Sequence, residues 1–428
     1  MPAPPASPLT RKHAAMLGLS ALGGGLELYD FMVFVFFVPV ISQVFFPPDT
    51  PRWLAELQTF TVFAVGFLAR PLGGVLFGHF GDRIGRKRTF TFSVLLMAGA
   101  TLAIALLPGY REIGIAAPVI LAALRLVQGL AVGGEVAGGY VFASEHVPPN
   151  RRGLACGVLA AGATTGTLLG VSMATFMHMV ASPQDILAFA WRIPFLVGSV
   201  LGLVTLILRR WLEETPVFQD LQRRRALAVQ LPVKLVVREH SAALAVSALG
   251  MWVLVGHFAV LVLMGPTLLQ TQYHFPAEQA LGIGSAGTFC SFFACLVSGL
   301  MFDRLGPGRA LLVASLLAGL ASQFFLAVAV HHPGLLLPAY CAATFGTGLL
   351  TAVPLLAIRS FPPQVAFSGV SLAYNFGFGI MAGLTPIFIA AVIPVFPAIP
   401  MAYLLALEAT GVALGFVLMR RPADAAPV

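Results

Sequence analysis

The chain has 428 residues, of which 58% are hydrophobic and only 10% are charged, and its formal net charge is +8. Soluble domains have about a quarter of their residues charged, so this composition excludes a soluble enzyme and indicates an integral membrane protein. The basic residues form short clusters between apolar runs, as in loops at a membrane surface and unlike a nucleic-acid interface.

Apolar segments long enough to cross a bilayer, about 20 residues each, recur along the whole chain. The first follows Arg11 and Lys12 as in a signal peptide, but apolar residues continue to Phe46, so we expect an uncleaved helix. Charged and turn-forming residues divide the sequence into twelve such segments, with the ranges 14–44, 53–79, 89–108, 113–143, 153–180, 190–210, 241–270, 279–302, 309–331, 334–358, 367–394 and 398–419. These ranges predict an all-α membrane protein with twelve transmembrane helices.

The longest polar stretch runs from residue 209 to residue 240 and separates six expected helices from the next six. We therefore predict an N-terminal bundle over residues 1–210, a linker over 211–240 and a C-terminal bundle over 241–428. An even number of crossings places both termini on one side, and most of the 25 Lys and Arg residues fall on that side. The positive-inside rule assigns it to the cytoplasm.

A charged turn after the second expected helix returns, in related form, after the eighth. The first copy is Gly78-His79-Phe80-Gly81-Asp82-Arg83-Ile84-Gly85-Arg86-Lys87-Arg88, and the second has Gly299, Asp303, Arg304, Gly306 and Arg309 at the matching places. Related turns at equivalent positions indicate two structural repeats of six helices. The second copy has Pro307-Gly308 in place of Arg86-Lys87, so we expect weaker contacts there.

Ionisable side chains inside a membrane are energetically costly and mark functional positions. Within the expected helices they are Glu27, Asp30, Arg70, Arg125, Glu135, His257 and Glu408. Glu27 and Asp30 share one face of the first helix, where neighbouring carboxylates can hold a proton near neutral pH. A structural ion pair is the alternative for these two acids.

The fourth expected helix carries Arg125, Gln128 and Glu135 on a single stripe. From their depth along the helices we expect Arg125 to pair with Glu27 or Asp30, and Arg70 to form a buried charge pair with Glu135. Because arginine stays protonated, Arg125 would also attract a substrate carboxylate and compete with it for the neighbouring acid.

Polar side chains near the middle of the expected helices are further candidates for substrate binding. The full set of substrate-binding candidates is Tyr29, Arg125, Gln128, His257, Tyr374 and Asn375. His257 has the alternative of a packed, hydrogen-bonded histidine, and no partner for Glu408 is evident. The four cysteines lie inside apolar segments and are expected to be packing residues, and we expect no metal, cofactor or enzymatic activity.

The turn from Gly78 to Arg88 resembles the signature between helices two and three of the major facilitator superfamily. Further stretches, spread over essentially the whole chain, resemble its metabolite:proton symporter branch: Glu27-Leu28-Tyr29-Asp30-Phe31, Arg70-Pro71-Leu72-Gly73-Gly74, Arg125-Leu126-Val127-Gln128-Gly129, Gly133-Gly134-Glu135, Trp191-Arg192-Ile193-Pro194-Phe195 and Glu214-Thr215-Pro216-Val217-Phe218. The resemblance implies two pseudo-symmetric six-helix halves, alternating access and a proton-coupling network that includes Arg125. It also implies a cytoplasmic gate formed by Gly78, Asp82, Arg83, Gly85, Arg86, Asp303 and Arg304. We expect the whole proton-coupling group to be Glu27, Asp30, Arg125 and Glu135.

The function that the resemblance implies is a monomeric symporter of a bacterial-type inner membrane. It would import a small organic acid such as citrate, tricarballylate or a dicarboxylate together with protons. The second half has only His257 to balance the extra charge of a tricarboxylate, so a mono- or dicarboxylate stays open. The alternatives are uptake of a zwitterion such as proline or betaine, export by proton antiport, and a membrane receptor that transports nothing. The short segment after Arg421 lacks the coiled coil of osmosensing betaine transporters, which disfavours betaine.

Overall fold

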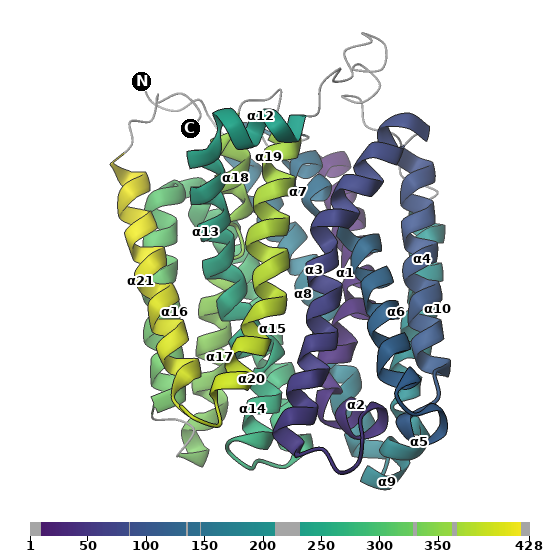
Figure 1. The fold of residues 1–428 in the computed structure, drawn as a ribbon. Coiled ribbons are helices and arrows are strands. Elements are labelled where there is room, and N and C mark those ends of the chain that lie inside the picture. The colour runs from purple at the N-terminus through teal and green to yellow at the C-terminus, as the bar shows by residue number, and fades with distance from the viewer. Residues whose placement is uncertain are drawn as a thin grey trace, which may run out of the picture.

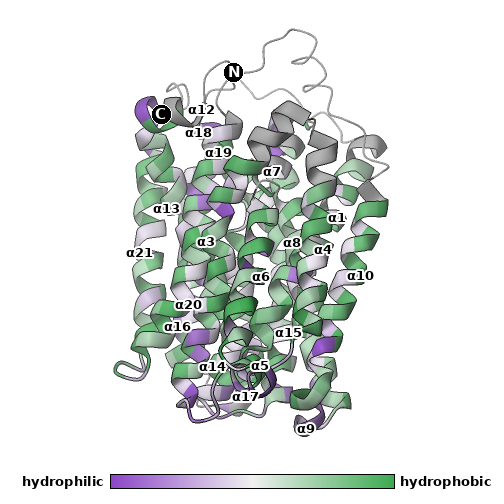
Figure 2. Ribbon diagram, turned by 45° about the vertical axis from the view of Figure 1, so that its right-hand side comes forward, coloured by the Kyte–Doolittle hydropathy of each residue, from purple (hydrophilic) through white to green (hydrophobic). Residues whose placement is uncertain are grey.

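The computed structural model describes residues 10–84, 86–133, 136–145, 147–209, 232–327, 332–361 and 366–420. Within these ranges the regular structure is helical, and long helices lie side by side in one bundle (Figure 1). Hydrophobic residues cover most of each helix, and hydrophilic residues gather mainly towards the two ends of the bundle (Figure 2). Large apolar side chains such as Leu320 (72% exposed) point outward, as contact with lipid requires.

The helices before the linker form the N-terminal half. Its long helices are α1 (Arg11–Phe36), α3 (Arg52–Ile84), α4 (Arg86–Leu106), α6 (Ala116–Gly133), α8 (Arg152–Val180) and α10 (Arg192–Arg209). Shorter elements connect or extend them: α2 (Val38–Phe45), α5 (Tyr110–Ile113), α7 (Val136–Glu145), the 3-10 helix η1 (Pro149–Arg151), α9 (Pro183–Asp185) and the π-helix η2 (Ile186–Ala190).

The C-terminal half follows the short helix α12 (Pro232–Glu239). Its elements are α13 (Ser241–His257), the π-helix η3 (Phe258–Leu263), α14 (Gly265–Thr271), α15 (Ala277–Leu305), α16 (Pro307–Ala327), α17 (Pro333–Leu349), α18 (Pro354–Ser360), α19 (Ala366–Tyr374), the π-helix η5 (Asn375–Ile380), α20 (Met381–Val392) and α21 (Ile399–Met419). The first helix, α1, begins at the same end of the bundle as that at which the last helix, α21, finishes (Figure 1).

The twelve expected crossings are present in the part of the chain that the structure describes. Ten helices are long and apolar enough to cross a membrane, and an eleventh crossing is a pair, 183–190 and 192–207, bent by 47°. The twelfth is α4, whose apolar part is the shorter helix Phe92–Leu106. The fold class predicted from the sequence is therefore confirmed.

The two halves meet chiefly along two pairs of helices, and α7 contacts α19 as well. One pair is α8 with α15, and the other is α3 with the consecutive elements η5 and α20. A Cβ placed on Gly383 of α20 would lie 3.2 Å from the Cα of Ala64 of α3, so these helices approach to backbone contact. Small residues at such positions are what allow helices to pack closely in a membrane.

Candidate functional site

At one end of the contact between α8 and α15, three glycines, Gly153, Gly157 and Gly299, form what we call the glycine seam. A Cβ on Gly153 would lie 2.5 Å from the carbonyl oxygen of Gly299, and one on Gly299 would lie 2.6 Å from that of Gly153. A Cβ on Gly157 would lie 2.5 Å from the carbonyl oxygen of Cys295. No side chain fits at these three positions, so the seam is backbone against backbone.

Asp303, near the end of α15, closes this seam across the two halves. Its Oδ1 accepts a hydrogen bond from Gly153 N at 2.7 Å, and its Oδ2 accepts one from Leu154 N at 2.8 Å. The first N–H groups of a helix have no partner within the helix, and a negative charge beside them is favourable. Asp303 therefore caps α8 from the opposite half, as a gate residue would.

The other expected gate residues are described only in part. Arg304, which follows Asp303, is exposed. Gly85 lies outside the described residues, and Gly78, Asp82, Arg83 and Arg86 are helical but their side chains lie outside the description. Their gate role and the comparison of strength between the two turns stay predictions.

Arg70 lies where α3 meets the other half and is 1% exposed. Its guanidinium carbon lies 5.5 Å from the ring centre of Phe67 of α3 and 5.6 Å from the ring centres of Tyr374 and Phe378. The rings of Tyr374 and Phe378 stack on each other at 4.9 Å. Aromatic faces attract a cation, so rings from both halves hold this arginine in place. Its expected partner, Glu135, lies outside the described residues, and that pair stays a prediction.

Asn375 joins the same region to α6. Its Nδ2 donates to Gly133 O, at the end of α6, at 3.1 Å and to Ser371 O at 3.1 Å. Tyr140 of α7 adds a ring 5.8 Å from that of Tyr374. Arg70, Tyr140, Tyr374, Asn375 and Phe378 form what we call the interface cluster. Of the predicted substrate-binding residues, Tyr374 and Asn375 belong to it.

Arg125 lies elsewhere, enclosed within the N-terminal half. Its guanidinium carbon is 4.2, 4.6 and 5.1 Å from the ring centres of Phe31, Phe34 and Phe63. Its NH1 donates to Gln128 Oε1 at 2.8 Å and to Phe31 O at 3.3 Å. The side chain has no exposed surface, so in this conformation the guanidinium of Arg125 is enclosed by aromatic rings, and its predicted contact with substrate stays a prediction.

Gln128 has a structural neighbour on α4 as well. Its Nε2 donates to Thr101 Oγ1 at 2.9 Å, and neither Gln128 nor Thr101 has exposed surface. Gln128 thus connects Arg125 to α4 inside the N-terminal half. Gln128 does not belong to the interface cluster, and its predicted contact with substrate stays a prediction.

The sequence predicted that Arg125 pairs with Glu27 or Asp30, and of these two pairs the one with Asp30 does not form. A Cβ on Gly198 of α10 would fall 2.2 Å from Asp30 Oδ1, so the carboxylate points at α10. Arg125 instead contacts Phe31, the next residue along α1. Successive residues of a helix point about 100° apart, so equal depth did not give them the same direction. The side chain of Glu27 lies outside the description, and its pairing with Arg125 stays a prediction.

Tyr29 also faces α10. Its hydroxyl donates to Pro194 O at 2.9 Å, and only 1% of the residue is exposed. Tyr29 and Asp30 therefore attach α1 to α10. Tyr29 does not belong to the interface cluster, and its predicted contact with substrate stays a prediction. The short distance between these helices depends on Gly198, where a side chain would collide with Asp30.

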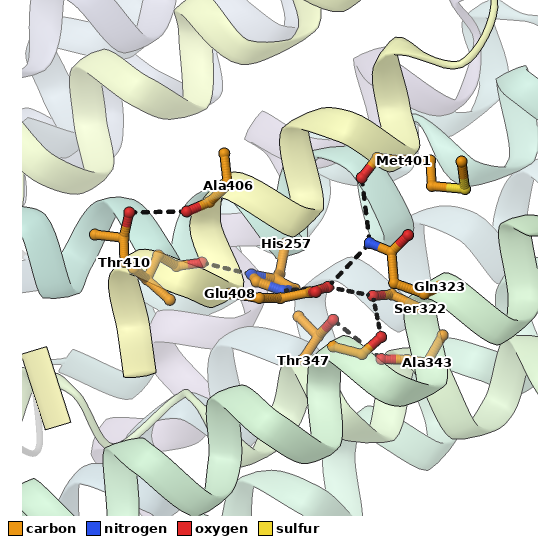
Figure 3. Close-up of polar contacts among 11 residues, drawn as sticks. His257, Ser322, Gln323, Ala343, Thr347, Met401, Ala406, Glu408 and Thr410 are labelled. Carbon is orange, nitrogen blue, oxygen red and sulfur yellow. Dashed lines mark hydrogen bonds and ion pairs between the residues drawn. The ribbon is translucent and has the colours of Figure 1, made fainter. Parts of the chain in front are cut away.

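His257 lies inside the C-terminal half, with a partner that the sequence did not reveal (Figure 3). Its Nε2 is 3.8 Å from Glu408 Oε1, and this oxygen also accepts hydrogen bonds from Ser322 Oγ at 2.7 Å and Gln323 Nε2 at 3.3 Å. The sequence left Glu408 without a partner because its neighbours come from two other helices. The consecutive polar pair Ser322-Gln323 in an otherwise apolar segment was the available signal.

A family model for the Major Facilitator Superfamily matches residues 20–386. The chain belongs to the major facilitator superfamily. The proline/betaine transporter of Salmonella typhimurium is 31% identical over 385 residues, which cover 86% of this chain and 75% of that protein. The shikimate transporter of Escherichia coli is 32% identical over 397 residues, which cover 91% and 89%.

Solved structures agree on the fold of this superfamily member. The xylose transporter XylE from E. coli, in a partially occluded inward-open conformation, gives a TM-score of 0.72 at 17% identity and covers 98% of this chain and 100% of its own. The protein is therefore a multi-pass membrane transporter and not an enzyme. The relatives named above carry proline, betaine or shikimate in their names, and none of these names mentions citrate.

Proposed function

We propose that this superfamily member imports, together with protons, a small solute with one carboxylate: a zwitterion of the proline or betaine kind, or an acid of the shikimate kind. The organic-acid expectation is thereby kept, but without citrate and tricarballylate. The proposal includes the orientation expected from the positive-inside rule, with both termini in the cytoplasm of a bacterial-type cell.

The observation that carries this proposal is the interface cluster. Arg70 brings a guanidinium that can bind a carboxylate through two parallel hydrogen bonds. Tyr140, Tyr374 and Phe378 bring aromatic faces, which attract an ammonium group. These side chains come from both halves, and transporters of this kind bind their substrates between repeats near the middle of the membrane.

The charge of the cluster favours one carboxylate over three. Arg70 is its one charged member, and the phenols and the amide of Asn375 supply neutral hydrogen-bond donors. Three carboxylates in a buried site would require several cations. A zwitterion matches the cluster best, because its carboxylate can reach Arg70 while its cationic group lies over the rings that now hold Arg70.

Proton coupling is proposed for the acids of α1. Asp30 is 1% exposed and faces α10, and a buried carboxylate is a natural site for a proton. Arg125 contacts the next residue of α1 through the carbonyl oxygen of Phe31, so a movement of α1 on protonation reaches Arg125. Glu27 and Glu135 complete the proposed coupling group.

The test is transport into liposomes that contain the purified protein. An inward proton gradient is expected to drive proline, betaine or shikimate above equilibrium, and an uncoupler should abolish the accumulation. Arg70→Gln is expected to weaken substrate binding about tenfold or more, because it removes a charged hydrogen bond. The control is Arg111→Gln, in an exposed connection. Accumulation of citrate alone, or uptake indifferent to the gradient, would contradict the proposal.

A further inference from the structure

A second group of polar side chains, two of them ionisable, lies inside the C-terminal half, and the proposed function does not use it. It comprises His257 of α13, Glu408 of α21, and Ser322 and Gln323 of α16 (Figure 3). The His257 side chain has no exposed surface, and that of Glu408 is 10% exposed. Ionisable groups at such a depth among apolar helices are functional candidates.

The contacts of His257 determine how many protons this group holds. A backbone carbonyl can only accept, so His257 Nδ1, which lies 2.8 Å from Val253 O, carries a hydrogen. If Nε2 also carries a hydrogen, His257 is a positively charged imidazolium that faces the ionised carboxylate of Glu408. If Nε2 carries none, His257 is neutral and Glu408 must be the protonated group. If both lacked the hydrogen, a lone pair would face a negative oxygen in an apolar environment, which is unfavourable. The arrangement therefore favours one proton held by Nε2 or by Glu408, whose atoms lie 3.8 Å apart.

The surroundings of Glu408 suit both protonation states. Ser322 Oγ lies 2.7 Å from Glu408 Oε1 and 3.0 Å from Gly319 O, and its one hydroxyl hydrogen can serve either acceptor. When the carboxylate gains a proton, this hydroxyl can turn to Gly319 O, so no donor is left unsatisfied. Gly319 also provides the space, because a Cβ there would lie 2.7 Å from the carboxyl carbon of Glu408.

No other charged side chain of the surrounding helices, in their described parts, competes for this proton. Asp, Glu, Lys and Arg are absent from α13, η3, α17, α19, η5 and α20, and Glu408 is the one such residue in α21. Two further elements pack against α13: α18 carries Arg359, which lies beside Asp303 of the glycine seam, and α12 ends at Glu239, 18 residues or about 27 Å before His257. The phenol of Tyr374 of α19 belongs to the interface cluster. Arg309 of α16 precedes Ser322 by 13 residues, about 20 Å along the helix. The remaining ionisable groups are the thiol of Cys341 and two phenols: Tyr340 donates to Leu261 O, and Tyr403 accepts from Trp252.

We propose that His257 and Glu408 form a proton-binding site of the C-terminal half, separate from the acids of α1, which exchanges its proton when α13 moves against α21. His257 is the last residue of α13, and the π-helix η3 follows it directly. Wide turns of this kind are often found at functional sites, and a shift of the wide turn would rotate His257 away from Glu408. That this pair binds a proton is independent of the proposed function. That the proton is used in transport rests on the proposed function.

The first test detects the proton on purified protein and needs no substrate. His257→Asn removes the cation, so Glu408 is expected to take up a proton and show the infrared carbonyl band of a carboxylic acid at neutral pH. The part of this band that depends on Glu408 should be weaker in wild type, where His257 shares the proton, and absent from His257→Asn/Glu408→Gln. If His257→Asn has no band that depends on Glu408, the proposal is overturned.

The second test separates coupling from stability in liposomes. Glu408→Gln is expected to keep substrate exchange without a gradient, while its accumulation under a proton gradient falls to an inside-to-outside ratio of about 1, the value for an uncoupled carrier. Tyr403→Phe is the matched control: it removes the acceptor of the 2.8 Å hydrogen bond from Trp252 Nε1, which joins the same two helices, and should keep both activities.

Two transport outcomes overturn the proposal. One is full accumulation by Glu408→Gln. The other is an equal loss of exchange and accumulation that Tyr403→Phe reproduces, which would make the pair a structural connection between helices. If Glu408→Gln does not fold, the infrared comparison of His257→Asn with wild type decides. If wild type transports none of the solutes, the proposed function is wrong. The infrared comparison then still decides whether His257 and Glu408 bind a proton.

Discussion

Replacing Asp303 by alanine removes the carboxylate that connects α15 to the first turn of α8. Both of its oxygen atoms accept backbone hydrogen bonds there, at 2.7 Å from Gly153 N and 2.8 Å from Leu154 N. When this end of the glycine seam opens, water can serve the same N–H groups. Asp303→Ala is therefore expected to destabilise only the state in which α8 and α15 touch at this end.

The size of the effect follows from known contributions at helix ends. A capping side chain contributes about 1 kcal/mol, and a negative charge near a helix N-terminus adds about 0.3–1 kcal/mol. Asp303 is partly exposed, so water screens the charge and we take about 1.5 kcal/mol in total. Since 1.4 kcal/mol is about a factor of ten in an equilibrium, the open form should become about tenfold more populated.

The rate at which Cys156 reacts with a thiol reagent can measure this opening. Its side chain is buried next to Gly157, in the glycine seam. In a chain whose other three cysteines are replaced by serine, a water-soluble maleimide should label Cys156 about ten times faster after Asp303→Ala, because labelling follows the open population when opening is fast. The control is Val297→Ala, a residue of α15 that is 44% exposed. An unchanged rate for Asp303→Ala, or the same increase for Val297→Ala, would refute this interpretation of Asp303.

Three further predictions concern other contacts. Gly299→Ala places a Cβ 2.6 Å from Gly153 O, so labelling of the same cysteine should exceed the wild-type rate; an equal rate would show that the seam adjusts. Arg125→Lys loses the flat contact with three rings, roughly 1–2 kcal/mol, and should lower the melting temperature by about 2–4 °C in a thermal-shift assay. Asn375→Asp replaces a donor by a negative oxygen facing Gly133 O, so it should reduce liposome uptake more than Asn375→Ala; the reverse order would contradict the hydrogen bond.

The crossings could be predicted from the sequence because lipid leaves the chain little choice. Every spanning segment needs about 20 apolar residues, and charged turns must lie outside, so the helix ranges could be found by inspection. The interruptions could not. The π-helices η3 and η5 begin at Phe258 and Asn375, inside segments that the sequence predicts as continuous spans.

The sequence identified the buried charged residues of the site but not the residues that they contact. The buried charges Asp30, Arg70, Arg125 and Glu408 could all be selected, because charge inside a membrane is rare. Their contacts depend on the direction in which each side chain points, which depth along a helix does not determine. Phe31 and not Asp30 therefore meets Arg125, and Glu408 meets helices that the sequence does not place beside it.

The glycine seam also bears on how fast the halves can separate. Where bulky side chains interdigitate, parting two helices requires many rotamers to change together, and closing them again requires each rotamer to return. At Gly153, Gly157 and Gly299 there are no such rotamers, so the activation barrier at this end should come mainly from the two hydrogen bonds of Asp303. The seam thus allows frequent opening and closing without a loss of register between the halves.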